Sequence, residues 1–210
     1  MAYFRCIGGN GGGQIAKKIN GRFGTTNGIV LVEGRYLSNL DSTIYMPVTE
    51  NNAAPVYDLT KPMKIHMRFK CASQNYAAQA LVAADSSTYG RPRIEFCGTQ
   101  YNDILMTAGW TTNGSSWNSW LTINKSSVPY SANSWYTADY VWDGTTFSFT
   151  VSDGEHSATA SAAQSQFYPS NNNIVFGKSS TGGVPANKIT FDLFDCYYEQ
   201  DGVIIWGNKA

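Results

Sequence analysis

Two Asp-Gly pairs, Asp143-Gly144 and Asp153-Gly154, divide residues 135–161 into three short stretches in which apolar and polar residues alternate. Alternation with a period of two places successive side chains on opposite faces of a β-strand. Asp-Gly pairs suit the positive φ angles of tight hairpin turns, and turns spaced about 8–12 residues apart are typical of all-β sandwiches and barrels. The segment therefore predicts a three-stranded antiparallel meander.

The same alternation recurs along the chain from residue 23 onward. Residues 63–71 place Met, Ile, Met, Phe and Cys on one face and Lys64, His66, Arg68 and Lys70 on the other, as in a half-buried strand. The one helix candidate is residues 14–19. Further strands are predicted at residues 28–33, 80–83, 91–97, 104–108, 120–124, 173–178, 188–198 and 202–206. These signals together predict an all-β fold.

A run of glycine and asparagine at positions 8–13 separates the N-terminal residues from the predicted strands. Such a composition is typical of a flexible linker. We interpret residues 1–22 as an N-terminal arm for attachment or assembly. Residues 23–210 are then one β-sandwich domain, which is large enough to fold around a single core without disulfides.

The composition argues against several classes of partner. Charged residues make up 14% of the chain and the formal net charge is zero, so we expect neither nucleic acid nor a membrane surface as a partner. No apolar run approaches the about 20 residues that span a bilayer, and residues 1–6 do not resemble a signal peptide. The widely spaced cysteines are expected to stay reduced rather than to form disulfides, and they lack the close ligand pairs of a zinc site. They are Cys6, Cys71, Cys97 and Cys196.

Two segments resemble the laminin-G/pentraxin branch of the concanavalin A-like superfamily. The first is Trp135-Tyr136 followed by the Asp143-Gly144-Thr145 turn and the strand that ends at Asp153-Gly154. The second joins residues 174–177 to residues 189–195. The resemblance implies a jelly roll of two curved antiparallel sheets, and it implies glycan binding, because members of this family often bind glycans.

A second resemblance concerns the N-terminus. Residues 2–6, Ala-Tyr-Phe-Arg-Cys, precede the glycine-rich run and resemble the start of tail-associated structural proteins in phages of Gram-positive bacteria. This implies a virion protein that assembles in the host cytoplasm. Its partners would be other virion proteins and further copies of itself.

No catalytic motif is found, and we expect a non-enzymatic protein. Glycosidases need two carboxylates about 5–10 Å apart, but Asp192 and Asp195 differ in parity and are expected to face opposite sides of their sheet. His66 and His156 are interpreted as solvated surface histidines. A hydrolase or lyase with an unrecognised acid pair stays an alternative. A Ca²⁺ site also stays open, because Ca²⁺ needs several converging oxygens. Its candidate acids are Asp143, Asp153, Asp192, Asp195, Glu199 and Asp201.

Five of the six tryptophans fall within residues 110–142. Trp135 and Trp142 are expected to pack in the core. Trp120 has opposite parity to Leu121 and Ile123, which predicts that it points outward. An outward tryptophan beside amides and hydroxyls suits either sugar stacking or a subunit interface. The candidate glycan-binding residues are Trp120, Asn118, Thr122, Asn124, Tyr101 and Asn102.

The leading hypothesis is a glycan-binding or host-recognition module of a virus particle, with a cell-surface or cell-wall glycan as ligand. A structural particle protein that only makes subunit contacts is the alternative. The low charge of residues 117–124 favours a neutral polysaccharide as the ligand.

Overall fold

The structure is a computed structural model of the 210-residue chain. It describes the backbone of residues 6–7, 14–15, 24–25, 30–32, 36–38, 44–46, 61–72, 79–84, 93–96, 103–110, 119–164, 174–176 and 189–210. Side chains are described for residues 61–72, 81, 93–96, 103–110, 120–164, 189–192, 194–204 and 209–210. All elements in this part of the chain are β-strands, as the alternation predicts.

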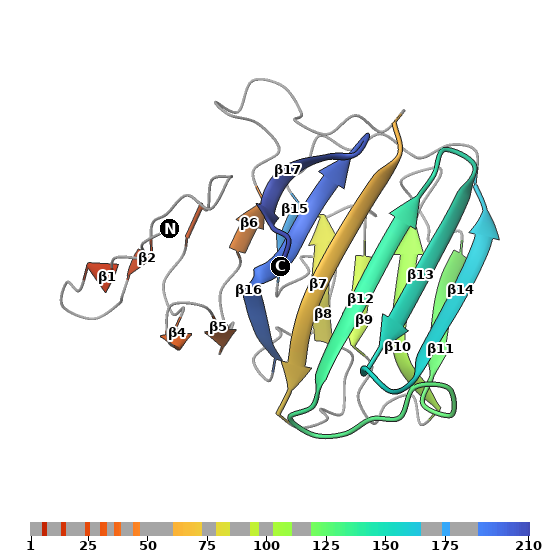
Figure 1. The fold of residues 1–210 in the computed structure, drawn as a ribbon, viewed down its shortest axis with the longest axis horizontal. Helices are drawn as coiled ribbons and strands as arrows, with labels where there is room; N and C mark the ends of the chain where they lie inside the picture. Colours follow the sequence, from red (N-terminus) through yellow and green to blue (C-terminus); the bar gives the residue numbers. More distant parts are fainter. Residues whose placement is uncertain are drawn as a thin grey trace.

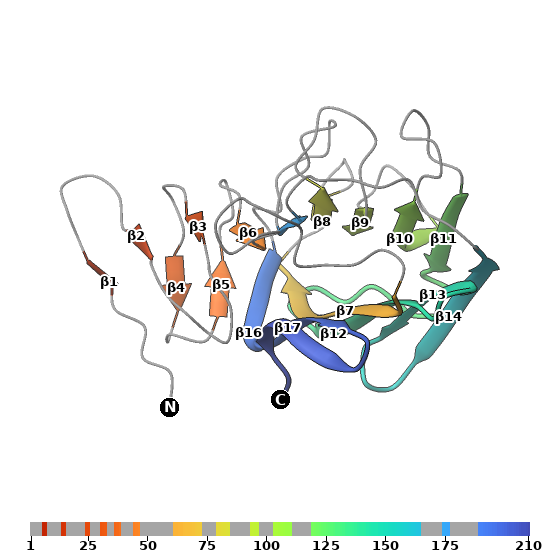
Figure 2. The same cartoon turned by 90° about the horizontal axis from the view of Figure 1, so that it is seen from above.

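Two large antiparallel sheets pack face to face as two layers (Figures 1 and 2). The seven-stranded sheet has the order β11-β10-β9-β8-β15-β6-β3. Its strands are β3 (Gly24–Thr25), β6 (Ile44–Met46), β8 (Gln79–Ala84), β9 (Arg93–Phe96), β10 (Ile104–Trp110), β11 (Ser119–Asn124) and β15 (Ile174–Phe176).

The second sheet has the order β14-β13-β12-β7-β16-β5-β4, and β17 also pairs with β16. Its strands are β4 (Val30–Val32), β5 (Tyr36–Ser38), β7 (Met63–Cys71), β12 (Trp135–Trp142), β13 (Thr146–Ser152), β14 (Ser157–Ala163), β16 (Ile189–Gln200) and β17 (Val203–Asn208). The expectation of a two-sheet antiparallel sandwich is confirmed. The very short strands β3, β5 and β6 were not predicted.

The core lies between the sheets and consists of the inward faces of the alternating strands. In β7 and β12 every second residue is buried, starting with Met63 and Tyr136. Aromatic rings fill much of this space: Phe69 lies 6.0 Å from Phe96 of the opposite sheet, between ring centroids. Trp110 and Phe147 stack across the sandwich at 4.8 Å. Such aromatic pairs stabilise a core beyond the area that they bury.

The predicted meander is confirmed as the strands β12, β13 and β14. Gly144 and Gly154 have φ angles of +105° and +96°, which explains why glycine follows aspartate in both turns. In the first turn, Asp143 Oδ1 accepts hydrogen bonds from the backbone N–H groups of Thr145 and Thr146. The carboxylate of Asp143 thus stabilises the turn by binding backbone groups two and three residues further on.

The helix predicted at residues 14–19 is wrong, because Gln14–Ile15 forms strand β2, which pairs with β1 (Cys6–Ile7) in a small sheet of its own. Pairing with a strand that lies a few residues earlier in the chain has overridden the local pattern here. The division of the chain into an arm at residues 1–22 and a sandwich at residues 23–210 stays a prediction. No helix in the described ranges is long and apolar enough to cross a membrane.

Two of the four cysteines have described side chains. Cys71 and Cys196 are both buried in the core. Burial raises the pKa of the Cys196 thiol well above its ordinary value, so this side chain behaves as a small apolar group. The side chains of Cys6 and Cys97 lie outside the described residues.

Candidate functional site

Strand β11 presents the candidate residue Trp120 on the outer face of the seven-stranded sheet. Leu121 and Ile123 are 5% and 2% exposed and belong to the core, whereas Trp120 is 39% exposed. Thr122 and Asn124 share the outward side of the strand with Trp120. The parity prediction for this strand is therefore confirmed.

Gly109 of β10 lies directly opposite Trp120 in the β10–β11 pair. A Cβ atom built on Gly109 would come within 2.8 Å of both Cε3 and Cζ3 of the indole. Real atoms do not approach so closely, so the ring rests on the strand at a position where only glycine leaves room for it. One face of the indole is thus held against the sheet while a large part of the ring stays in solvent.

Arg93 of β9 completes this face from the other side of β10, where it pairs with Gly109. Its guanidinium carbon lies 5.9 Å from the centroid of the Trp120 ring, within the range of a cation–π contact. The carboxylate oxygen Oε1 of Glu95 accepts hydrogen bonds from both Nε, at 2.8 Å, and Nη2 of Arg93. Glu95 therefore neutralises the arginine beside the indole.

Sequence reasoning missed Arg93, Glu95 and Gly109 as members of this face. They are separated from Trp120 by up to 27 positions, and only the register of β9, β10 and β11 brings them together. We name the group of Arg93, Glu95, Gly109, Trp120, Thr122 and Asn124 the Trp120 face. The other candidates, Asn118, Tyr101 and Asn102, lie outside the described residues.

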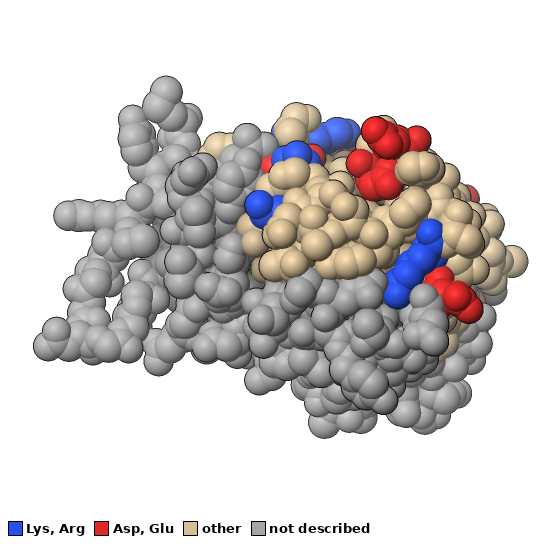
Figure 3. Space-filling model, turned by 90° about the horizontal axis from the view of Figure 1, so that it is seen from below, with Lys and Arg blue, Asp and Glu red and all other residues tan. Residues whose placement is uncertain are grey.

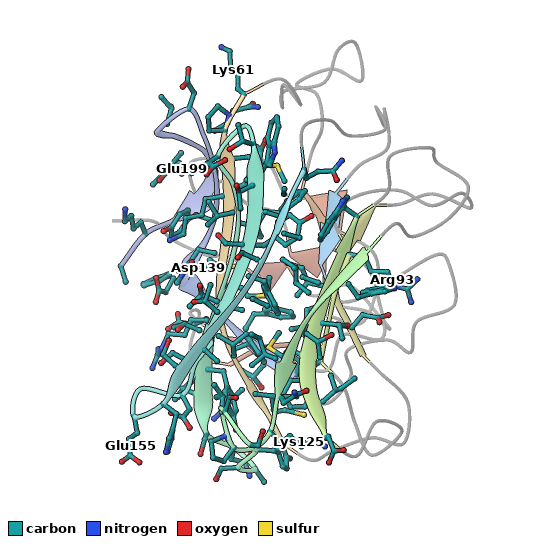
Figure 4. All side chains as sticks on the ribbon, turned by 90° about the vertical axis from the view of Figure 1, so that its right-hand side faces the viewer. Lys61, Arg93, Lys125, Asp139, Glu155 and Glu199 are labelled. Carbon is teal, nitrogen blue, oxygen red and sulfur yellow. The ribbon has the colours of Figure 1, made fainter. Side chains whose placement is uncertain are left out.

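The opposite outer face of the sandwich carries a second polar group (Figure 4, where Asp139 and Arg93 mark the two faces). His66 of β7 lies there between two aspartates. Its Nδ1 is 2.6 Å from Oδ1 of Asp139, and its Nε2 is 3.2 Å from Oδ1 of Asp195. The ring also stacks on Tyr197 at 4.9 Å. The interpretation of His66 as a solvated histidine is wrong, since its side chain is only 12% exposed.

Lys64 and Asp139 shift each other's pKa in this group. Burial favours the neutral form of each residue, but the opposite charges outweigh it. Hydrogen bonds from His66 and Lys64 hold the pKa of Asp139 below its ordinary value. The hydrogen bond to Asp139, at 2.9 Å, and its charge raise the pKa of Lys64. Both groups are therefore ionised over a wide range of pH.

The parity prediction for Asp192 and Asp195 is wrong. Four residues of β16, from Asp192 to Asp195, lie opposite the single residue Arg68 of β7. This irregularity turns both carboxylates toward cationic side chains of one face. Asp192, which is fully buried, binds Nη1 of Arg68 at 2.6 Å, and Asp195 approaches His66. A bulge of this kind re-aims side chains in a way that parity counting misses.

Trp135 also differs from its expected place. The guanidinium carbon of Arg68 and Nζ of Lys70 lie 4.4 Å and 5.1 Å from the centroid of its ring. Trp135 thus lies on the outer face of β12, where its parity places it opposite to the buried Tyr136. Trp142 is 3% exposed and packs in the core as expected.

Several of the described carboxylates accept hydrogen bonds from groups of the chain itself. Asp153 Oδ1 accepts hydrogen bonds from the backbone N–H groups of Glu155 and His156, as Asp143 does in its own turn. The imidazole of His66 lies between Asp139 and Asp195 and contacts both carboxylates. Within the described ranges, no three His, Cys, Asp or Glu side chains converge as metal ligands. Basic and acidic side chains lie interspersed on the face drawn in Figure 3.

The structure is similar to several known structures. Domains LG4-5 of the mouse laminin alpha1 chain match with a TM-score of 0.51 and 15% identity, over 69% of this chain and 37% of that one. The binding domain of botulinum neurotoxin serotype D matches with a TM-score of 0.59 and 10% identity, over 89% and 44%.

The fold is a concanavalin A-like jelly roll. This confirms, at the level of the fold, the resemblance to laminin-G domains. The enzymatically active domain of tailspike protein 2 of bacteriophage CBA120 also matches, with a TM-score of 0.53 and 8% identity, over 88% of this chain and 32% of that one. The chain thus spans less than half the length of each of these three chains. No family model and no curated protein matches the sequence.

Proposed function

We propose that the chain is a non-enzymatic glycan-binding module and that the Trp120 face is its binding site. The observation that carries the proposal is the indole of Trp120, which is 39% exposed and rests on Gly109. A ring held in this way is a rigid apolar platform for the C–H face of a sugar. Burying apolar area on both partners contributes about 25 cal/mol per Å².

The surroundings of the ring supply the polar half of a sugar site. Thr122 and Asn124 offer neutral hydrogen-bonding groups beside it. Arg93 and Glu95 add a donor and an acceptor whose charges offset each other, and hydrogen bonds to charged groups are the stronger ones. The site therefore suits an uncharged sugar better than an anionic one. A polysaccharide without charge is the ligand that we propose.

The biological setting belongs to the same proposal. Host recognition by a virus particle is supported by the fold shared with a phage tailspike domain and with a neurotoxin binding domain. In this setting the protein would act in the virion, together with other virion proteins. One shallow sugar site binds weakly, so many copies on a particle would supply the avidity.

The test is a glycan array or a polysaccharide pull-down with the full chain and two matched variants. Trp120→Ala removes the platform, and we expect it to abolish binding. Trp135→Ala removes an outward tryptophan on the opposite face, and it should bind as the wild type does. Equal binding by both variants would place the glycan site elsewhere. No binding by the wild-type chain to any glycan would favour a purely structural particle protein.

A further inference from the structure

Strand β14 is the terminal strand of its sheet and lies at the right-hand margin of Figure 1. All seven of its residues pair with β13, without a register shift. Strand β11 of the other sheet lies across the sandwich from β14. The backbone of β11 pairs with β10 and not with β14. Among the described strands, none hydrogen-bonds to the outer edge of β14.

The hydrogen bonds at both ends of the β13–β14 hairpin identify the backbone groups at this edge. Asp153 N donates to His156 O, and Gln164 N donates to Thr145 O. Because hydrogen-bonded pairs alternate with non-bonded pairs in an antiparallel ladder, Ala158, Ala160 and Ala162 bond to β13. The N–H and C=O groups that point to the outer edge belong to Ser157, Thr159, Ser161 and Ala163. All four of these residues are exposed.

This edge lacks the features that usually keep a sheet from pairing with another chain. The sequence of β14 is Ser-Ala-Thr-Ala-Ser-Ala-Ala, with no charge, no proline and no bulge. Natural proteins commonly protect a long edge strand with lysine, proline or a bulge, since its unpaired groups otherwise bind another strand. Its side chains are also small, so they do not hinder close approach.

We propose that β14 pairs antiparallel with β14 of a second copy, across a two-fold axis at Ala160, so that one sheet continues through a homodimer. In this register, residue 159 of each copy faces residue 161 of the other, and residue 157 faces residue 163. These are the residues with outward N–H and C=O groups, so each pair exchanges both hydrogen bonds. The pairing is self-complementary, as a two-fold interface requires.

The side chains agree with the same register. Ala158, Ala160 and Ala162 are only partly buried against the core of one copy, and they would face the same three alanines of the second copy. Thr159 would face Ser161 on the outer side. His156 would face the uncharged Gln164, and the charged turn residues Asp153 and Glu155 lie outside the paired residues 157–163. No like charges therefore oppose each other along the strand.

The mass of the full chain in solution tests this proposal. We expect sedimentation equilibrium to give twice the chain mass of 23.0 kDa. Ser161→Pro removes one outward N–H without touching the ladder to β13, and it should give a monomer. Thr159→Lys with Ser161→Lys should also give a monomer, because each lysine would face a lysine of the second copy.

Two controls make the outcome specific to the register. Thr159→Lys with Ser161→Glu places opposite charges in the facing positions, and it should restore the dimer. Ser148→Lys adds a charge to the same face but in β13, which has strands on both sides, and it should stay dimeric. A wild-type chain that stays monomeric up to about 1 mM, which corresponds to a free energy of association weaker than about −4 kcal/mol, would overturn the proposal. So would an oligomer of any size that Ser161→Pro and the double-lysine variant leave unchanged.

Discussion

Trp120 and Gly109 face each other across the β10–β11 pair, and the indole ring occupies the space that a side chain at position 109 would need. The exposed tryptophan thereby rests with its ring against the backbone of β10. Rigid placement matters for a shallow sugar site, because a ring that had to be ordered on binding would lose affinity. The glycine is thus as much a part of the proposed site as the tryptophan.

Gly109→Ala should displace the indole. A Cβ only 2.8 Å from two ring atoms forces the ring to move, and we expect a loss of stability of about 1–3 kcal/mol, as for other overpacked sites. In a Trp120→Ala background the same change should be neutral or stabilising by about 0.5–1 kcal/mol, since alanine is less flexible than glycine. Urea unfolding of the four proteins of this double-mutant cycle measures the coupling. Additive effects would show that the ring does not rest on residue 109.

Trp142→Ala and Trp135→Ala should differ strongly in stability. Trp142 is 3% exposed and donates a hydrogen bond from Nε1 to the backbone oxygen of Gln164 at 3.0 Å. We expect its removal to cost about 3–5 kcal/mol. Removal of the Trp135 ring mainly loses its cation–π contacts with Arg68 and Lys70, and we expect this to cost about 1 kcal/mol. Thermal unfolding of the two variants makes the comparison, and equal losses would contradict the outward position of Trp135.

Asp192→Ala should be among the more costly changes on the polar face. The carboxylate is fully buried, binds Arg68, and accepts a hydrogen bond from Phe194 N at 3.1 Å. Its loss leaves those donors unsatisfied, at a cost of about 2–4 kcal/mol. Lys61→Ala is the control, because it removes an exposed ion pair with Asp201 at 3.9 Å, which contributes less than about 0.5 kcal/mol. Denaturant unfolding of both variants measures the two losses of stability. Equal losses would contradict the buried, hydrogen-bonded position of Asp192.

Asp139→Asn should destabilise the protein in a pH-dependent way. The folded-state pKa of Asp139 lies below its ordinary value of 3.8, so its ionised form stabilises the fold above that pH. This contribution is lost as the pH falls through the lowered pKa. The stability gap between the wild type and Asp139→Asn, about 1–2 kcal/mol near neutral pH, should therefore shrink in acid. Urea unfolding at a series of pH values measures the gap, and a gap that stays constant would contradict the ion-pair assignment.

The class of fold and most strands were predictable, because they depend on local patterns. Alternation in residues 63–71 and the two Asp-Gly turns led directly to β7 and to the β12–β14 meander. The same reasoning failed at His66 and Trp135. Their outward parity was readable, but what covers an outward residue depends on its neighbours. Asp139 and Asp195 cover the histidine, and Arg68 and Lys70 flank the tryptophan.

Where a strand runs without an irregularity, the sequence by itself determined which side of the strand each side chain takes. It therefore placed Leu121 and Ile123 inward and Trp120 outward, since hydrophobic burial depends on the period of two within one strand. Only the tertiary structure decided which residues of other strands stand beside them. The register brought Gly109 and Arg93 to Trp120, and the four-residue irregularity in β16 turned Asp192 and Asp195 to one face. Such pairings follow from backbone hydrogen bonds between distant segments, whose partners no local pattern specifies.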